Sequence, residues 1–467
     1  MWTWRFLLFL KFLEVVFSIQ PSRGSKLLLL LRPRSRHTSL IYPLDTFTTP
    51  LLELQEVQGD KNIHFERLND LLYTVDVDSV HGSNKAKGSL DVSRCILAHS
   101  VHLVHDSSDN PSTLSALPAK SSSSSRKFFI SAIILDNPYM TNEAIDKLIL
   151  QPIITNTFQR LQRVYKEKHA ENDLKYRVIV DSRRDKYFLT EQLSRGLASS
   201  VDKGEGIREV FASKDANRRP NNGVLKRFSL NRLYFRTKTS LEPEIALLMC
   251  SFAKLVPNGQ RPLRILDCFC GSCMILLAAS IHMTVESSTF FPSSYPLMVG
   301  VDANRDVFDL DGIKNNFKHM NKSHIFETQL SLFHGYFTDL MDQDNYSLSY
   351  MHGQSRDVEC GLFDAIITDP PYDMNERIRE EREDDYCRSN NDAFYRAFLI
   401  MASKRLKVGG RVVFFYPEVG INHLLHPSIC YDDEAMQHFI LVHSIRQRFS
   451  STFSRYLLVL EKRQNQD

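Results

Sequence analysis

The sequence lacks an excess of one charge, a regular cysteine framework and a long uncharged apolar run. Lys and Arg total 58 against 55 Asp and Glu, so the net charge is only +3. A surface for nucleic acid would therefore have to come from local clustering of basic residues. Eight cysteines in 467 residues, without regular spacing, exclude a disulfide scaffold and indicate reduced thiols, so we expect a cytoplasmic protein.

The first 25 residues form an apolar segment of uncertain role. Residues 2–19 are very apolar, but Arg5, Lys11 and Glu14 interrupt them. A signal peptide needs an apolar stretch of about 7–15 residues without charge, and a spanning helix needs ~20 apolar residues. We therefore expect no membrane anchor, while an organelle presequence or a local element of the first domain stays open.

Composition divides the remaining chain into two regions, 26–225 and 226–467. The first has irregularly spaced apolar strands and one helical pattern, which predicts an α+β region. Within it, the polar segment 106–126 contains five consecutive serines, and such a composition predicts a disordered insert.

The second region alternates short apolar strands with helices, the pattern of an α/β domain. Strands are expected at 264–267, 297–301, 365–368, 411–416, 439–444 and 456–460, and helices at 241–255, 274–281 and 391–406.

The most informative stretch is the strand that ends in Asp369-Pro370-Pro371-Tyr372. Two prolines in a row end the strand and stiffen the loop that follows. In an open α/β sheet, ligands bind at the carboxyl ends of the strands. The loop is thus expected to present a carboxylate, carbonyl groups and an aromatic ring to a ligand.

This combination suits a flat base with an exocyclic amine. The Asp369 carboxylate and the Pro370 carbonyl can accept its N–H groups, and Tyr372 can stack on the base. The tetrapeptide resembles the signature of amino-methyltransferases, which move a methyl from S-adenosylmethionine to an amine of adenine, cytosine or guanine. Taken alone, it is also compatible with a strand-end turn that has no catalytic role.

A second set of residues is typical of a nucleotide-like ligand site. The expected strand 264–267 ends at Asp267 and is followed by a turn that contains Phe269, Gly271 and Ser272 before the next helix. That geometry lets backbone amides and a helix N-terminus meet an anionic group. Asp302 ends the next strand, where an acid commonly bonds ribose hydroxyls, although an insertion delays it.

Cys268, Cys270 and Cys273 fall within the same turn. Their spacing lacks a fourth ligand, so we interpret them as packed thiols and expect no metal.

The most basic window is 210–238, with eight Lys or Arg and one acid. Aromatic residues are interleaved with the cations, a pattern that favours tracking of a phosphate backbone over the alternative of a solvated linker. The candidate contacts are Arg227, Arg232, Arg236 and Lys238.

Together these segments resemble the tRNA guanosine-10 N2-methyltransferase family. The likeness runs from about residue 231 to 463. Its motifs are Thr239-Ser240-Leu241, Asp267-x-Phe269-x-Gly271-Ser272, Gly300-x-Asp302, Asn316-Phe317, Phe363 to Tyr372, Gln447-x-Phe449 and Arg455-x-Leu457-Leu458.

The resemblance implies a Rossmann-like class I methyltransferase domain with a seven-stranded, mostly parallel sheet. The resemblance also implies a THUMP-like RNA-binding region before this domain, and S-adenosyl-L-methionine as the cofactor. The implied substrate is tRNA, with Pro371 in contact with the base, and the implied partner is a small zinc-binding activator subunit.

Two positions depart from that family's pattern. Cys273 replaces the second glycine of its Gly-Thr-Gly loop, and Tyr336 occupies the place of an acid that would hold the donor's adenine. Two alternatives therefore stay open: an adenine-N6 nucleic-acid methyltransferase, or a non-catalytic RNA-binding relative.

Overall fold

The structure, a computed structural model, describes most of the second region and the strands of the first. The described residues are 26–31, 53, 65–67, 72–76, 98–111, 114, 127–135, 141–157, 162–163, 174–182, 184–195, 207–211, 224–255, 261–284, 295–341, 348–353, 362–371, 391–419, 428–448 and 453–464. The expected apolar segment 1–25 lies outside them. Within these ranges, no helix has the length and apolarity that crossing a membrane requires.

The described residues form two compact units: the second contains those after Asn221 together with Glu53, and the first contains the rest. The main boundary, after Asn221, lies four residues before the one expected from composition. The first unit contains a nine-stranded sheet in the order β2-β3-β1-β4-β8-β7-β5-β6, with β9 paired to β5. The strands are β1 Lys26–Leu31, β2 Phe65–Arg67, β3 Leu72–Asp76, β4 Ala98–Ser108, β5 Lys127–Leu135, β6 Gln162–Arg163, β7 Leu174–Asp181, β8 Lys186–Arg195 and β9 Ile207–Phe211.

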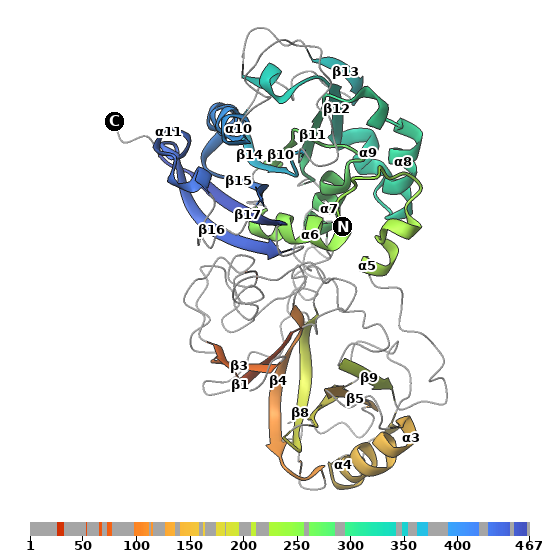
Figure 1. Cartoon of the computed structure of the whole chain (residues 1–467). Coiled ribbons are helices and arrows are strands. Elements are labelled where there is room, and N and C mark those ends of the chain that lie inside the picture. The colour runs from red at the N-terminus through yellow and green to blue at the C-terminus, as the bar shows by residue number, and fades with distance from the viewer. Residues whose placement is uncertain are drawn as a thin grey trace, which may run out of the picture. The chain divides into compact units, whose positions relative to one another are not determined.

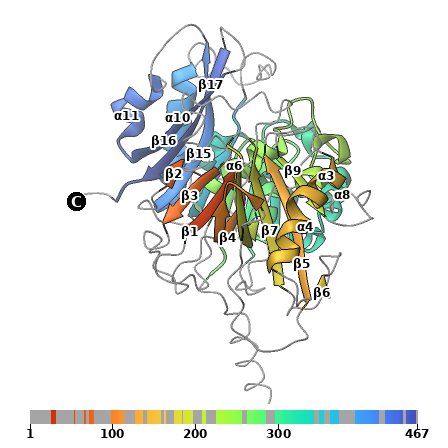
Figure 2. The same cartoon turned by 90° about the horizontal axis from the view of Figure 1, so that it is seen from below.

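A helical segment follows β5 in the chain and precedes β6 and β7, which both pair with β5 in parallel. It consists of α3 (Asn142–Ile145), a π-helical stretch (Asp146–Leu150) and α4 (Gln151–Thr157). Its apolar face, which includes Ile145 and Ile149, packs on buried side chains of β5 and β7. Figure 2 shows the ribbons of α3 and α4 beside these strands. The expected α+β character of the first region is confirmed.

Part of the segment 106–126, which was expected to be a disordered insert, is ordered. Strand β4 continues to Ser108, which pairs with Tyr187 of β8. Leu114 is 1% exposed and belongs to the apolar cluster beneath α3 and α4. Pairing with a neighbouring strand outweighs the low strand propensity of Asp and Ser here. The rest of the segment, 115–126, lies outside the described residues.

The second unit is built on an eight-stranded sheet in the order β13-β12-β11-β10-β14-β15-β17-β16 (Figure 1). The strands β12, β11, β10, β14 and β15 are parallel, whereas β17 runs antiparallel between β15 and β16. The expected Rossmann-like α/β class is confirmed. The expected count of seven strands was one short, because β13 adds an antiparallel edge to β12.

The elements of this unit follow in chain order. They are α5 Val224–Arg227, η4 Leu230–Arg232, α6 Pro243–Phe252, β10 Arg264–Asp267, α7 Met274–Met283, β11 Leu297–Asp302, η6 Arg305–Val307, α8 Leu310–His319, α9 Ser323–Gln329, β12 Leu330–His334, η7 Phe337–Leu340, β13 Ser349–His352, β14 Phe363–Thr368, α10 Asn391–Arg405, β15 Leu406–Val419, η10 Ser428–Tyr431, α11 Asp433–Met436, β16 Phe439–Arg448 and β17 Phe453–Lys462.

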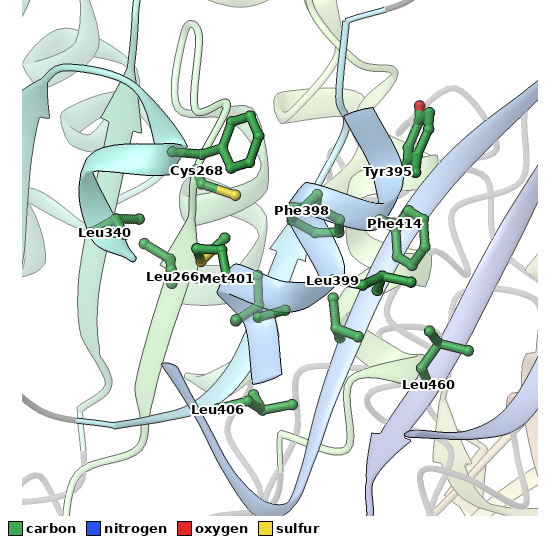
Figure 3. Packing of buried hydrophobic residues seen from close by; sticks show 14 of the residues in the cluster. Leu266, Cys268, Leu340, Tyr395, Phe398, Leu399, Met401, Leu406, Phe414 and Leu460 are labelled. Carbon is green, nitrogen blue, oxygen red and sulfur yellow. The ribbon is translucent and has the colours of Figure 1, made fainter. Parts of the chain in front are cut away.

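Helix α10 covers one face of the sheet. Its side chains Phe398 and Met401 are buried among alternate residues of the strands, such as Leu266 of β10 and Phe414 of β15 (Figure 3). Alternation follows from the two-residue period of a strand, which sends every second side chain to the same face. This packing fixes the strand ends from which the candidate site is built.

One residue of the region expected to belong to the first domain packs instead in the second unit. Glu53 is fully buried, and its Oε1 accepts a hydrogen bond of 3.0 Å from the Ser251 hydroxyl at the end of α6. A buried carboxylate requires such donors, and α6 supplies one. Composition alone could not show that a residue this early in the chain packs in the second unit.

The turn between β10 and α7 contains a residue in the left-handed region. Cys273 has φ +61° and ψ +29°, and its side chain is fully buried. This is the position where the resembled family has glycine, which adopts that conformation without a Cβ clash.

We predict that Cys273→Gly is more stable than Cys273→Ala. Both variants lose the sulfur, but only Ala keeps the Cβ that is strained at positive φ. Glycine also makes the unfolded chain more flexible, which lowers stability and offsets part of the gain. The free energy of unfolding, measured in urea, should therefore be higher for the Gly variant by roughly 0.5–1 kcal/mol. An Ala variant equal to or more stable than the Gly variant would show that the turn bears no such strain.

Candidate active site at the carboxyl edge of the sheet

The predicted site residues lie where the order of the parallel strands reverses. From β10 the chain proceeds outward through β11 and β12, and then returns to β14 on the other side of β10. Such a switch point is the usual ligand crevice of an open α/β sheet. Asp267 and Asp302 are the last residues of β10 and β11. Gly271, Tyr336 and Asp369 lie just after β10, β12 and β14, respectively.

Asp267 is the buried centre of this edge, with 1% of its surface exposed. Its Oδ1 accepts hydrogen bonds from the Thr368 hydroxyl at 2.7 Å and from the Phe269 amide at 3.2 Å. Its Oδ2 is buried and has no hydrogen-bond partner in the structure. Burial raises the pKa of Asp267 to about 7; the two hydrogen bonds oppose the rise, whereas the nearby carboxylates Asp302 and Asp369 add to it.

Asp302 ties the Gly271 turn to the neighbouring strand. Its Oδ2 accepts the Gly271 amide at 2.8 Å, and its Oδ1 accepts the Asn304 amide at 2.9 Å. Gly271 has φ +47°, and a Cβ built there would meet no atom within 4 Å. The side of the turn at Gly271 is therefore open to a ligand.

Tyr336 follows β12 at the same edge. The loop is joined to β11, because the Gly335 amide donates to the Asp302 carbonyl at 3.0 Å. Although Tyr336 replaces an expected acid, Asp339 lies in η7, which begins directly after it, and the Asp339 Oδ2 accepts the Tyr336 amide at 2.9 Å. A carboxylate is thus present beside Tyr336, three residues later than expected.

Asp369 directly follows β14, and 16% of its side chain is exposed. Its Oδ2 pairs with the Arg455 guanidinium of β17 at 3.4 Å. Pro370 is buried and Pro371 is half-buried, as expected for a stiff corner at the edge of the core. Tyr372 lies outside the described residues, so its predicted stacking role stays a prediction.

Phe269 lies against an aromatic cluster beside the turn. Its ring centroid is 5.4 Å from that of Phe337 in η7 and 5.7 Å from that of Phe394 in α10. It is itself only partly buried. The cluster gives the edge an apolar wall, and neither Phe337 nor Phe394 was predicted.

The three cysteines of the turn are buried free thiols. Burial raises the pKa of the Cys268 and Cys270 thiols, which disfavours the thiolate that a metal would need.

The predicted basic residues split into an exposed group and one half-buried residue. Arg232, Arg236 and Lys238 are exposed, whereas Arg227 is half-buried. The exposed ring of Tyr234 lies among them, with 70% of its surface accessible. The three exposed cations and Tyr234 form what we call the basic segment.

Hydrogen bonds hold the basic segment and the residues after it to helix α8 and to the Gly271 turn. The buried Asn316 side chain accepts the Tyr234 and Phe235 amides at 2.7 and 3.1 Å and donates to the Phe235 carbonyl at 2.7 Å. Further along, the Ser240 hydroxyl lies 2.7 Å from the Ser272 hydroxyl. A surface suited to phosphates is thereby connected to the turn at the strand ends.

The structure thus brings together Asp267, Phe269, Gly271, Asp302, Tyr336 and Asp369. Besides Phe337 and Phe394, the polar residues Thr368, Asp339 and Arg455 were not predicted as site residues. Thr368 directly precedes the proline motif, and Arg455 lies in a closing segment that was noted only for its resemblance. Their partners could be identified only from the strand order.

Comparisons with known proteins give low similarities. No protein-family model matches the chain, and no curated protein matches it. Among solved structures, TrmN from Thermus thermophilus is 17% identical with a TM-score of 0.39, covering 94% of this chain and 99% of that chain. A predicted N6-adenine-specific DNA methylase from Listeria monocytogenes is 12% identical with a TM-score of 0.36, covering 93% and 95%. A methyltransferase from Pyrococcus furiosus is 14% identical with a TM-score of 0.29, covering 50% and 89%. At these values the structures assign no activity or substrate to this chain.

Proposed function

We propose that this protein is an S-adenosylmethionine-dependent methyltransferase that modifies the exocyclic N2 amine of a guanosine in tRNA. The observation that supports this most is the position of Asp369, a carboxylate at the carboxyl end of β14, beside the buried Asp267 at the switch point. The choice of guanosine, and of position 10 in tRNA, comes from the family resemblance of the sequence motifs.

The residues present fit an S-adenosylmethionine molecule. The unpartnered Oδ2 of Asp267 would accept its ammonium group, which relieves the cost of the buried carboxylate. The open side of Gly271 would admit its backbone, and Ser272, Asp302, Phe269 and Tyr336 surround the same edge. When bound, this cofactor supplies a methyl group that its sulfonium already activates.

The protein's main task is then to orient the amine. Asp369 and the Pro370 carbonyl would accept its two N–H groups, because both are acceptors at a corner with little freedom to move. Pro371 and Tyr372 would contact the base, which would be flipped out of its tRNA helix to reach the loop after β14. Positioning of this kind can supply much of the rate enhancement.

We propose that tRNA binds through the basic segment and the THUMP-like first unit. The exposed Arg232, Arg236 and Lys238 would contact phosphates, with Arg227 in a lesser role because it is half-buried. The activator subunit and the cytoplasmic location remain proposals from the resemblance and from the cysteine content.

We predict that Asp369→Ala lowers the turnover number by at least about 100-fold, because the amine is no longer oriented. The dissociation constant of the donor should stay within about threefold, since Asp369 acts on the transition state. The assay uses labelled S-adenosylmethionine with total tRNA, and with duplex DNA in parallel, followed by identification of the methylated nucleoside.

The control variant is Asp311→Ala, which removes an exposed carboxylate of α8. It should leave turnover unchanged. Near-normal methyl transfer by Asp369→Ala would refute the role given to that residue. Label found only in adenine would favour an adenine-N6 enzyme, and an intact protein without donor binding would favour a non-catalytic RNA-binding role.

A second prediction concerns pH and Asp267. The folded-state pKa of about 7 is higher than the ~3.9 of an unfolded Asp, so the native protein holds the extra proton and its free energy of unfolding falls as the pH rises through this interval. Asp267→Asn does not titrate. Relative to the wild type, it should therefore gain about 2–3 kcal/mol between pH 5 and pH 8.

Urea unfolding at several pH values measures this difference. Saturating S-adenosylmethionine should reduce the pH dependence of the wild type, because its ammonium favours the ionised carboxylate. A stability difference between the variant and the wild type that stays flat with pH would show that Asp267 ionises normally.

A further inference from the structure

Arg455 is a buried guanidinium that the proposed chemistry does not by itself require. Only 6% of the residue is exposed, although arginine is rarely buried without a partner. It lies on β17, and β15 separates β17 from β14 in the sheet. Its NH1 nevertheless approaches Asp369 Oδ2 at 3.4 Å, so the side chain reaches across an entire strand.

Two contacts fix the path of this side chain. The Nε donates to Gln447 Oε1 at 2.6 Å, and Gln447 is its cross-strand partner on β16. The guanidinium carbon lies 3.7 Å from the ring centroid of Phe415, on the strand that it crosses. A planar cation stacked on an aromatic ring and bonded at one edge keeps its other edge in a fixed direction.

The direction in which the Arg455 guanidinium points is important because several carboxylates lie close together at this edge of the sheet. Asp267 on β10 lies close enough for Asp302 on β11 and Asp369 on β14 to raise its pKa. Like charges disfavour ionisation of one another. The charged groups near Asp369 include the carboxylate of Asp267 and the compensating guanidinium of Arg455.

We propose that Arg455 is a positioning residue that keeps the Asp369 carboxylate ionised and aimed at the substrate amine. This rests on the proposed methyl transfer. In that reaction the nitrogen lone pair forms the N–C bond, the C–S bond electrons return to sulfur, and the nitrogen then releases a proton. A carboxylate paired with a guanidinium is a good hydrogen-bond acceptor but a weak base, so this proton passes to solvent.

The test compares Arg455→Met and Arg455→Lys with Arg446→Met as the matched control. Arg446 belongs to the same hairpin, and it too donates from its Nε to a side-chain oxygen, that of Ser454, and lies over an aromatic ring, that of Tyr456. Arg455→Met should lower kcat about 100-fold through loss of orientation, with the KM for the donor little changed. The acid limb of its kcat–pH profile should move up by about one pH unit.

Arg455→Lys keeps the buried cation, and therefore tests the role even if the Met variant folds poorly. Lysine is shorter and has no Nε to bond Gln447, so kcat should fall about tenfold while the acid limb stays in place. Arg446→Met should match the wild type. A fall in kcat with an unmoved acid limb in Arg455→Met would overturn the proposal and leave Arg455 a structural residue.

Amide hydrogen exchange of the free protein tests the role of Arg455 without depending on the proposed methyl transfer. In the free protein, Arg455→Met should speed exchange in a peptide that spans 363–372 about tenfold, whereas Arg446→Met should not. A wild type that methylates no nucleic acid overturns the methyltransferase function alone. Unchanged exchange in that peptide shows that Arg455 does not hold the corner, whatever the reaction is.

Discussion

Three carboxylates lie at one edge of a parallel sheet, and contacts within the second unit offset the repulsion and desolvation that this causes. Each is stabilised in a different way. Asp302 accepts two backbone amides, Asp267 accepts a threonine hydroxyl and an amide, and Asp369 pairs with a buried arginine. Asp267 keeps a buried oxygen without a partner. The edge is therefore short of positive charge, which an ammonium and a sulfonium would provide.

The remainder of the unit serves to hold these groups in place. Helix α10 packs on one sheet face and fixes β14 beside β10. The hairpin of β16 and β17 carries Arg455 and Gln447, and so connects the last strands of the chain to the corner at Asp369. Asn316 holds the segment before Thr237, and the Ser240–Ser272 contact joins that segment to the Gly271 turn. In the proposed function, tRNA phosphates and the methyl donor would thus bind to directly connected elements.

Much of this unit could be predicted from the sequence, because its elements have strong local signals. The apolar run before Asp369 matches β14, and the strand–turn–helix pattern at 264–281 matches β10 and α7. Buried parallel strands read as short apolar runs, and consecutive prolines end them sharply. Hence the position of Asp267, Asp302 and Asp369 at the carboxyl ends of strands could be predicted, whereas their order along the edge could not.

What the sequence did not reveal depends on contacts between distant residues. Arg455 is 86 residues from Asp369, and its role requires knowing that β17 inserts between β15 and β16. The strand pairing of Ser108 and the burial of Glu53 are likewise tertiary effects that override local composition. Tyr336 looked like a missing acid because the loop places Asp339 beside it by its turn geometry.

In the proposed function, this edge of the sheet transfers a methyl group to guanosine N2 in tRNA. The most direct measurement is mass spectrometry of nucleosides from purified tRNA of cells with and without the protein. The account predicts loss of N2-methylguanosine from at least one tRNA, and its return on expression of the intact chain. Unchanged N2-methylguanosine in every tRNA would contradict it.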